Sequence, residues 1–499
     1  MTENGGAWRC SVCGYIHRGA DRPQLCQICG APRDQFESWR DFTLPPAAVS
    51  SQQWRCLICT YVHDGIEPPD TCPVCGAAAN HFEPVSEAAD ADPKVQSGGS
   101  FVIIGGGIAG VAALEYLRQV STATEITLVS KEPGLPYLRL NLTRYLAGEV
   151  GPPQLPIHPE GWYQKENVRM MLGVEARAIC LKEQTVELSD GNELHYERLL
   201  LAAGAHPFVP PFPGSHRIGV TTLRTIEDAD RILHATEEEG VKCVCIGGGI
   251  LGLETAAALA RRGADVTLLE GHGWLLPRQL NRRAGELLAN HASAKGINVR
   301  NNARTREILG DDSVRGVLLE DDTVIPADLV VIATGIRSNS HLARSAGLQC
   351  NRGVIVDDTL RTSEPTVFAA GDIAEHRGVV YGIWGPSQAQ GRIAAMNMAG
   401  TGTEFGGVPR SNTLKVLGLD LFSIGQINSE DASFDEFHCE DDSGYFRFLL
   451  RDSHLVGAIL LGDASLAARI QRAMESCEDF SKFAQRPAGA RELVAYLRE

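Results

Sequence analysis

The chain has 499 residues, a hydrophobic fraction of 43% and a formal net charge of −16 at pH 7. This length is too great for a single hydrophobic core and predicts several domains. The excess of acidic residues argues against nucleic acid and anionic membranes as partners. We expect a cytoplasmic protein, because the sequence shows no basic leader and no apolar run of ~20 residues.

An internal repeat occupies the N-terminal region. Residues 8–36 recur at 54–82, and in both copies twelve residues separate two Cys-x-x-Cys pairs. We predict two small modules, 6–40 and 52–86, each too short to fold on apolar contacts alone and therefore dependent on a metal. The predicted ligands are the cysteines of these pairs, which are Cys10, Cys13, Cys26 and Cys29 in the first module and Cys56, Cys59, Cys72 and Cys75 in the second.

Four thiolates in a tetrahedral cage suit a single iron or a zinc ion, and the spacing alone leaves both open. The residues around the pairs, in WRCSVCGYIHRGADRPQLCQICGAPRDQF, resemble the rubredoxin-like domain of rubrerythrins. That resemblance implies two mononuclear iron sites, each carrying one electron. The second copy departs at Thr60 and Ala78, where the first has Gly14 and Pro32, so the hydrogen bonding at the two sites need not match.

The body of the chain opens with an apolar strand, FVII, a glycine-rich turn, a helical pattern and a second strand, ITLV. The glycines of the turn are Gly105, Gly107 and Gly110. In this spacing glycines permit a tight turn, close approach of the backbone to a pyrophosphate and close packing of the helix. Glu132 is the nearest carboxylate after the second strand and is the expected ligand of the ribose.

The same pattern returns in VCIGGGILGLETAAAL, where the glycines are Gly247, Gly249 and Gly252. Glu270 ends the strand that follows, at the place where a carboxylate accepts hydrogen bonds from ribose hydroxyls. A carboxylate there repels a 2′-phosphate, and no arginine adjoins it in the sequence, so NADH is favoured over NADPH. Two complete patterns in one chain predict two bound dinucleotides.

Further stretches resemble the FAD/NAD-linked reductases, which include rubredoxin reductases, ferredoxin reductases and the flavoprotein part of NADH-dependent nitrite reductase. The stretches are LLLAAGAHP, VVIATGIRSN, TSEPTVFAAGD and WGPSQAQGRIAAMNMAG. The resemblance implies FAD at the first glycine-rich turn and NADH at the second, with Asp372 binding the ribityl chain. It places Gln390 and Gly391 in the helix that covers the pyrimidine end of the flavin.

The segment LPYLRLNLTRYL (135–146) resembles the flavin-side stretch of the same family, and Arg139 matches the family's arginine. Relatives carry a lysine at the position of Arg144, and that lysine pairs with the glutamate that corresponds to Glu254. The resemblance therefore implies a catalytic Arg144–Glu254 pair beside the reactive edge of the flavin. Residues 140–142 read Leu-Asn-Leu, so the thiols of the disulfide reductases are missing there, and the scattered cysteines outside the modules are expected to be structural.

These features predict an α/β protein in which two Rossmann-like three-layer domains and a C-terminal α+β domain follow two rubredoxin-like β modules. The predicted ranges are a flexible linker at 87–99, an FAD domain at 100–220 and 339–408, an NAD domain at 221–338 and the α+β domain at 409–499. In relatives the last of these often contributes to dimerisation, so a homodimer is one expected state.

The expected activity is transfer of electrons from NADH through FAD to the iron sites and on to an external acceptor protein, such as a di-iron peroxidase or oxygen reductase. No sirohaem or iron–sulfur domain follows the reductase, so nitrite reduction by this chain alone is not expected. Two alternatives stay open. In the first, the modules are zinc ribbons that bind a partner. In the second, the flavoprotein is an NADH oxidase that reduces oxygen directly.

Overall fold

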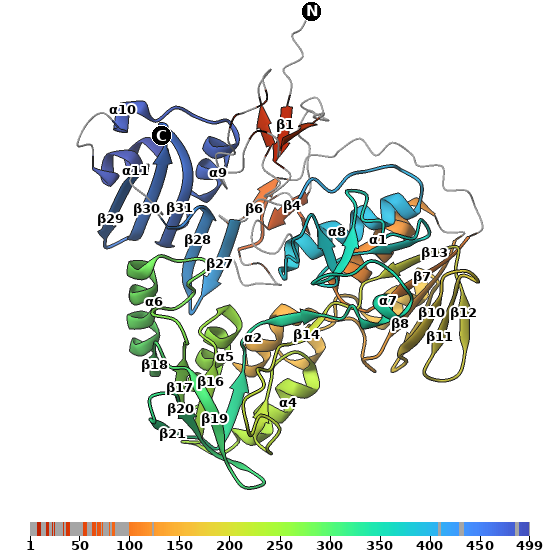
Figure 1. The fold of residues 1–499 in the computed structure, drawn as a ribbon, viewed down its shortest axis with the longest axis horizontal. Coiled ribbons are helices and arrows are strands. Elements are labelled where there is room, and N and C mark those ends of the chain that lie inside the picture. The colour runs from red at the N-terminus through yellow and green to blue at the C-terminus, as the bar shows by residue number, and fades with distance from the viewer. Residues whose placement is uncertain are drawn as a thin grey trace, which may run out of the picture.

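The computed structural model describes residues 7–10, 16–18, 22, 24, 33, 36–39, 53–56, 62–65, 67–70, 72, 79, 82–84, 99–121, 124–407, 411–428, 434–484 and 489–498. They form two small N-terminal sheets, two domains around parallel sheets, and a C-terminal antiparallel sheet with helices (Figure 1). This architecture confirms the predicted fold class. Of the predicted linker only Gly99 lies among the described residues. None of the helices among all the described residues is long and apolar enough to span a membrane.

The two N-terminal modules repeat one three-stranded antiparallel sheet. The strands are β1 (Ala7–Cys10), β2 (Ile16–Arg18) and β3 (Phe36–Trp39) in the first module, and β4 (Gln53–Cys56), β5 (Val62–Asp64) and β6 (Phe82–Pro84) in the second. The register repeats as well, because Cys10 pairs with Phe36 and Cys56 pairs with Phe82. In each module the first cysteine therefore ends the central strand, opposite an aromatic residue.

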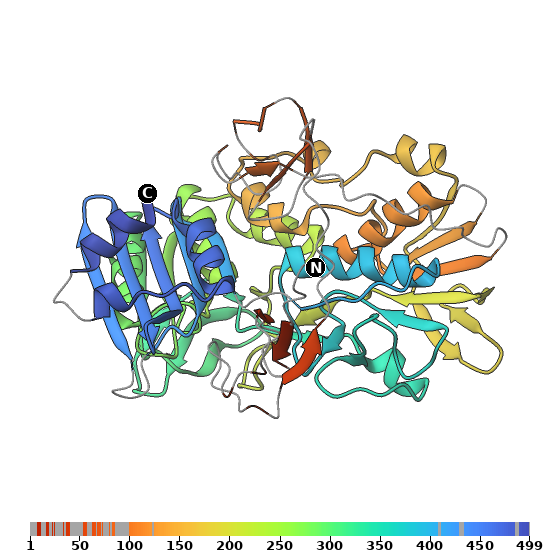
Figure 2. The same ribbon diagram turned by 90° about the horizontal axis from the view of Figure 1, so that it is seen from above.

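The first parallel sheet has the strand order β25-β13-β7-β8-β9. Its strands are β7 (Ser100–Ile104), β8 (Glu125–Ser130), β9 (Val168–Leu172), β13 (Arg198–Leu201) and β25 (Val367–Ala369). The central strand β7 is apolar and buried from Phe101 to Ile104, as expected for a parallel strand covered on both faces. Helices α1 (Ile108–Val120) and α8 (Trp384–Met398) pack on each other beside this sheet (Figure 2).

The second parallel sheet repeats this plan with the order β15-β22-β16-β17-β18. Its strands are β15 (Val220–Thr221), β16 (Lys242–Ile246), β17 (Asp265–Leu269), β18 (Ile297–Arg300) and β22 (Leu329–Ile332), with helices α4 (Ile226–Ala235), α5 (Ile250–Arg261) and α6 (Arg282–Ala294). Thr225 caps α4, because its hydroxyl accepts a hydrogen bond from the Asp228 backbone N–H at 3.2 Å. Each sheet thus carries one glycine-rich turn, between β7 and α1 and between β16 and α5.

Antiparallel strands connect the two domains. The chain leaves the first sheet after β13 through β14 (Ala205–Pro207), and returns from the second sheet through β23 (Ile336–Ser338), which pairs with β14. Because β25 and α8 follow this return, the first domain is built from two separate parts of the sequence. The shorter elements of the two domains are α2 (Leu142–Leu146), α3 (Glu160–Lys165), α7 (His341–Ser345), β10 (Ala176–Cys180), β11 (Thr185–Leu188), β12 (Glu193–His195), β19 (Thr305–Gly310), β20 (Val314–Leu319), β21 (Val324–Pro326), β24 (Val354–Val356) and β26 (Ala374–His376).

The C-terminal domain is a five-stranded antiparallel sheet with the order β27-β28-β31-β30-β29. Its elements are β27 (Ser411–Val416), β28 (Leu419–Gly425), β29 (Asp435–Asp441), β30 (Gly444–Arg451), β31 (His454–Gly462), α9 (Ala467–Glu475), α10 (Ser481–Ala484) and α11 (Ala490–Arg498). Phe446, Phe448 and Phe480 are fully buried in its core. The strands of the two modules lie between this domain and the first parallel-sheet domain (Figures 1 and 2).

Candidate dinucleotide and electron-transfer sites

The turn between β7 and α1 has the backbone shape of a dinucleotide-binding loop. Gly105 has a φ of +118°, and a Cβ there would lie 2.2 Å from the carbonyl oxygen of Ala202. A Cβ at Gly110 would lie 2.1 Å from the Gly105 carbonyl oxygen, so α1 packs directly on the turn. At Gly107, by contrast, a Cβ would meet nothing within 4 Å. The open side of the loop lies at the helix N-terminus, where backbone N–H groups can receive a pyrophosphate.

The turn between β16 and α5 reproduces this geometry in the second domain. Gly247 has a φ of +114°, and a Cβ there would lie 2.5 Å from the Ala333 carbonyl oxygen. A Cβ at Gly252 would lie 1.9 Å from the Gly247 carbonyl oxygen, whereas at Gly249 it would meet nothing within 4 Å. Both predicted loops therefore have the shape that a dinucleotide requires.

Glu270 stands where the sequence predicts a ribose-binding carboxylate, immediately after β17. The side chain is buried, and its Oε2 accepts a hydrogen bond from the Gly248 N–H at 3.0 Å. Its Oε1 accepts one from the His272 N–H at 2.7 Å. One backbone N–H of the second glycine loop and one just after β17 thus hold the carboxylate beside the place where the nucleotide would lie.

An arginine that the sequence analysis did not connect with Glu270 also lies near this site. A hollow of about 390 Å³ beside Gly271 is lined by Asn302, Arg304 and Glu320, among others. The fold brings Arg304 here from the loop after β18, which the linear distance from Glu270 conceals. Since an arginine can attract the 2′-phosphate that Glu270 repels, the preference for NADH over NADPH stays a prediction.

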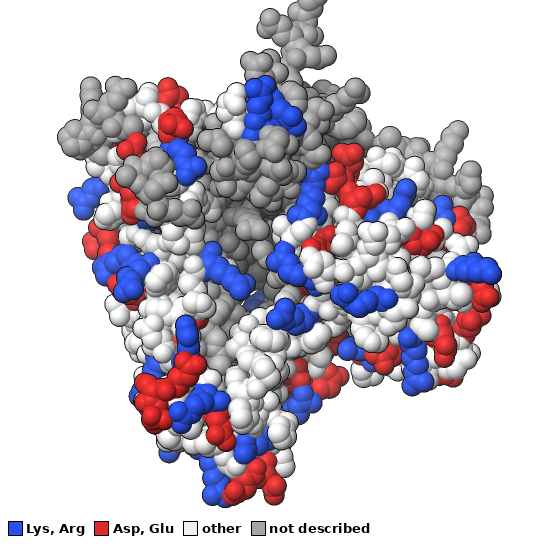
Figure 3. Space-filling model, in the orientation of Figure 1, with Lys and Arg blue, Asp and Glu red and all other residues white. Residues whose placement is uncertain are grey.

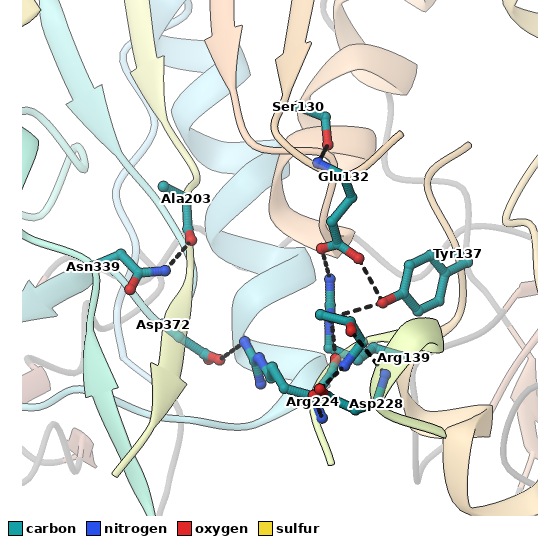
Figure 4. Close-up of polar contacts among 10 residues, drawn as sticks. Ser130, Glu132, Tyr137, Arg139, Ala203, Arg224, Asp228, Asn339 and Asp372 are labelled. Atoms are coloured by element: carbon teal, nitrogen blue, oxygen red, sulfur yellow. Dashed lines mark hydrogen bonds and ion pairs between the residues drawn. The ribbon is translucent and has the colours of Figure 1, made fainter. Parts of the chain in front are cut away.

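The predicted ribose ligand of the first loop, Glu132, already has protein partners. Tyr137 donates its hydroxyl to Glu132 Oε2 at 2.7 Å, and Arg139 Nη2 lies 2.6 Å from Oε1 (Figure 4). Burial raises the pKa of Tyr137, so its hydroxyl stays protonated as a donor. Arg139 is thereby oriented by Glu132, and both predicted residues belong to one polar cluster next to the first glycine loop.

The cluster continues to Asp372 through Arg224, a residue that the sequence analysis did not single out. Arg139 donates to the Arg224 carbonyl oxygen, and Arg224 Nη2 lies 3.2 Å from Asp372 Oδ2 (Figure 4). Burial, together with the nearby Arg139 guanidinium, lowers the pKa of Arg224, and Asp372 opposes this effect. Two half-buried arginines therefore converge between the predicted ribose and ribityl carboxylates, which fits an anionic FAD pyrophosphate.

Helix α8 closes the other side of the first loop. A Cβ at Gly391 would lie 2.1 Å from the Ala109 carbonyl oxygen, so the glycine allows α8 to touch α1. Gln390 Oε1 accepts a hydrogen bond from the Gly371 N–H at 2.8 Å, and its buried Nε2 has no hydrogen-bond partner among the described residues. A buried amide donor of this kind fits a ligand that supplies an acceptor.

The structure gives Arg144 and Glu254, the expected catalytic pair, separate partners. Arg144 Nε lies 3.2 Å from Glu149 Oε2. Glu254 Oε1 instead accepts a hydrogen bond from the Leu417 N–H at 2.9 Å, at the start of the C-terminal domain. Burial raises the pKa of Glu254. A guanidinium is not interchangeable with the lysine of the relatives, and the role of Arg144 and Glu254 beside the flavin stays a prediction.

Basic side chains border a hollow on one face of the molecule, although the chain as a whole is acidic. In Figure 3, Lys and Arg side chains border the central hollow on both sides. A local excess of positive charge around a hollow attracts anions such as dinucleotides and raises their rate of association.

Two of the predicted metal ligands are described with their side chains. Cys56 and Cys72 have 0% exposure and pack in one apolar cluster with Phe82. They belong to different Cys-x-x-Cys pairs, so the fold brings one cysteine of each pair into the same cluster, as a four-cysteine site requires. Cys10 is described as part of β1. The remaining predicted ligands, Cys13, Cys26, Cys29, Cys59 and Cys75, lie outside the described residues, and within the described part no group of three His, Cys, Asp or Glu could hold a metal.

The cysteines outside the modules differ in their exposure. Cys243 and Cys245 are buried in β16, and burial raises the pKa of Cys243 to about 12 and that of Cys245 further. Cys180 is exposed on β10. Buried thiols with raised pKa values are poor nucleophiles, which agrees with a structural role.

Three known families match successive parts of the chain. The pyridine nucleotide-disulphide oxidoreductase family matches residues 99–399, and the rubredoxin NAD+ reductase C-terminal domain matches residues 411–478. The rubredoxin-like domain of rubrerythrin matches twice, at residues 8–37 and 54–83. The predicted repeat and its family resemblance are thereby confirmed.

Individual relatives include reductases of two kinds. A nitrite reductase (NAD(P)H) of Bacillus subtilis is 36% identical over 386 residues, which cover 77% of this chain and 48% of the relative. A rubredoxin-NAD(+) reductase of Pseudomonas putida is 33% identical over 341 residues, 66% of this chain and 88% of the relative. The crystal structure of NADH:rubredoxin oxidoreductase from Clostridium acetobutylicum superposes with a TM-score of 0.69 at 26% identity, covering 80% of this chain and 99% of that one.

The chain spans about half the length of the nitrite reductase it matches, and most of the length of the rubredoxin reductase. The family supports FAD and NADH as cofactors of the two glycine-rich loops. This chain belongs to the pyridine nucleotide-disulphide oxidoreductase family and carries two rubrerythrin-type rubredoxin-like domains ahead of it.

Proposed function

We propose that this protein is an NADH-dependent FAD oxidoreductase that passes electrons to its own two four-cysteine iron sites and from there to an external acceptor protein. The observation that carries the proposal is the presence in one chain of two dinucleotide loops of the same geometry and two rubredoxin-like modules. A hydride donor and a flavin occupy two loops, and one-electron sites need a flavin between themselves and nicotinamide.

The described side chains suggest a division of tasks. The loop that begins at Gly247, together with Glu270, would bind NADH through its pyrophosphate and ribose. The loop that begins at Gly105 would bind the FAD pyrophosphate, with Arg224 and Asp372 beside the ribityl chain. When bound, FAD supplies the chemistry of accepting a hydride and releasing electrons singly.

The absence of thiols at 140–142 directs the electrons away from disulfide chemistry, despite the family's name. Relatives named rubredoxin-NAD(+) reductase support an acceptor of rubredoxin type, which this chain carries in duplicate. For the external acceptor we propose a peroxide- or oxygen-reducing di-iron protein, on the ground that the modules are of rubrerythrin type. We further propose a cytoplasmic location, because thiolate ligands stay reduced there. We also propose that the protein forms a homodimer.

The test is metal analysis followed by an anaerobic titration of the purified full-length protein with NADH, monitored by visible absorption. The expected result is two irons per chain, both bleached by NADH together with the flavin. Zinc in place of iron would contradict the proposal and favour modules that bind a partner. Iron that stays oxidised while the flavin is reduced, with rapid oxygen consumption in air, would favour a direct NADH oxidase.

A further inference from the structure

The second rubredoxin-like module rests on the first parallel-sheet domain through an apolar contact. Its buried residues Cys56, Cys72 and Phe82 form one cluster, against which Leu138 and Trp384 of the reductase pack. We refer to Leu138 and Trp384 together as the seat. Both predicted metal ligands in the cluster have 0% exposure, so the seat lies against the part of the module that would surround its metal.

The seat adjoins residues predicted to hold FAD from two directions. Leu138 lies between Tyr137 and Arg139, whose side chains both contact Glu132. Trp384 is the first residue of α8, and one turn later Ser387 donates its hydroxyl to Asp372 Oδ1 at 3.3 Å. A module resting on the seat is therefore next to the ribose end and the ribityl end of the proposed flavin site at once.

The first module has a different neighbour. Its strand β2 lies against α9 of the C-terminal domain. Figure 1 accordingly shows β1 farther from the parallel-sheet domains than β4 and β6, which lie beside α8. The two modules are alike in sequence and strand register but occupy unequal positions relative to the flavin site.

We propose that the four-cysteine site of the second module, which packs on Leu138 and Trp384, accepts electrons directly from the flavin site. The site of the first module then passes electrons to the external partner. This inference rests on the proposed function. In the balanced reaction one NADH becomes NAD+, one proton is released to water, and one electron goes to each of the two four-cysteine sites. Two single-electron sites per chain match the two electrons of one NADH, and the external acceptor then removes these electrons and completes the turnover.

The seat is tested by hydrogen–deuterium exchange on the full-length, iron-loaded protein. Trp384→Ala should raise amide exchange in β4 and β6 by at least about tenfold, as truncation of an aromatic anchor does at interfaces. Ile383→Ala is the matched control, because Ile383 is the adjacent apolar residue, 40% exposed, and is not part of the cluster. If β4 and β6 exchange equally fast in both variants and in the unaltered protein, the second module does not rest on the seat. An increase in exchange that is confined to the first module would refute the proposed contact as well.

The order of the sites is tested by rapid mixing with NADH under anaerobic conditions. Replacing Cys56 and Cys72 by Ser should leave the iron of the first site oxidised, or reduced at least about tenfold more slowly, while the flavin is still reduced. Replacing Cys10 and Cys13 should leave reduction of the second site at its original rate. Reduction of the first site at an unchanged rate without the second site, or loss of second-site reduction without the first, would overturn the proposed order.

The serine variants can fail to fold, whereas the Trp384→Ala variant keeps all eight predicted metal ligands and serves as an independent test. It should slow reduction of both irons, whereas Ile383→Ala should not. If NADH reduces the flavin of the unaltered protein but neither iron, the proposed function fails, and the exchange measurement still decides on its own whether the second module occupies the seat.

Discussion

The sharpest test of the dinucleotide assignment is a pair of alanine substitutions in the second glycine loop. A methyl group at Gly249 would meet no protein atom within 4 Å, and the residue has an ordinary φ of −76° and ψ of 178°. Gly249→Ala should therefore leave the fold intact, with a melting temperature equal to that of the unaltered protein or slightly higher, because alanine restricts the unfolded chain. The added methyl group would instead occupy the space on the side where a pyrophosphate approaches the backbone.

The magnitude follows from the hydrogen bonds at stake. Moving the phosphate away from the loop would lose one or two charge-assisted bonds from backbone N–H groups, about 2–3 kcal/mol, which corresponds to roughly 30- to 150-fold weaker binding of NADH. Gly252→Ala has the opposite profile. Its Cβ would lie 1.9 Å from the Gly247 carbonyl oxygen, so it should lower stability by about 1–3 kcal/mol through overpacking.

The assay combines thermal melting by circular dichroism with binding of NADH measured by fluorescence, both on protein that retains its flavin. A Gly249→Ala protein that binds NADH as tightly as the unaltered protein would show that this open side is not the nucleotide side. A Gly249→Ala protein that melts well below the unaltered protein would refute the claim that the space is empty. Gly252→Ala with unchanged stability would refute the close packing of α5 on the turn.

Three further substitutions or measurements probe other parts of the site. Asp372→Asn removes the carboxylate that faces Arg224 and should weaken FAD binding roughly 10- to 100-fold, measured as the flavin-to-protein ratio after dilution. Burial raises the pKa of Glu254, so its charged form weakens the fold, and Glu254→Gln should stabilise the protein at pH 8 by on the order of 1 kcal/mol. That gain should vanish in thermal melts below pH 4.5, the ordinary pKa, because the carboxyl is then protonated in both states. In the native protein at pH 8 an alkylating reagent should label exposed Cys180 and spare buried Cys243. Burial raises the pKa of Cys243 from 9.0 to about 12, which leaves about a thousandfold less thiolate. Equal labelling of the two cysteines, measured by mass spectrometry, would contradict this.

Local sequence patterns predicted the features that depend on neighbouring residues. The glycine spacing indicated both loops because the turn, the helix start and the close packing all lie within a few positions of Gly105 and Gly247. The repeated cysteine pairs indicated two modules because a metal cage this small is encoded in one short stretch. Glu270 was likewise identifiable, since it directly ends the strand that follows the loop.

Features that depend on contacts between distant segments were missed. Arg224 reaches Asp372 across 148 positions, and Arg304 reaches the hollow beside Gly271 from another strand end. No local pattern marks such residues. The contacts of Arg144 with Glu149 and of Glu254 with the Leu417 N–H likewise depend on the fold and not on a local pattern.

The position of the second module illustrates how much of this protein's chemistry is set by packing that the repeat itself does not reveal. In sequence the two modules are near equivalents, and both would be expected to exchange electrons with the flavin. Leu138 and Trp384 break that equivalence, because they offer an apolar contact beside the flavin site to Cys56, Cys72 and Phe82. A duplicated carrier with one copy held close and the other placed at the C-terminal domain can take both electrons of a hydride in sequence. Under the proposed function, the duplication gives each chain one single-electron site for each electron of a hydride.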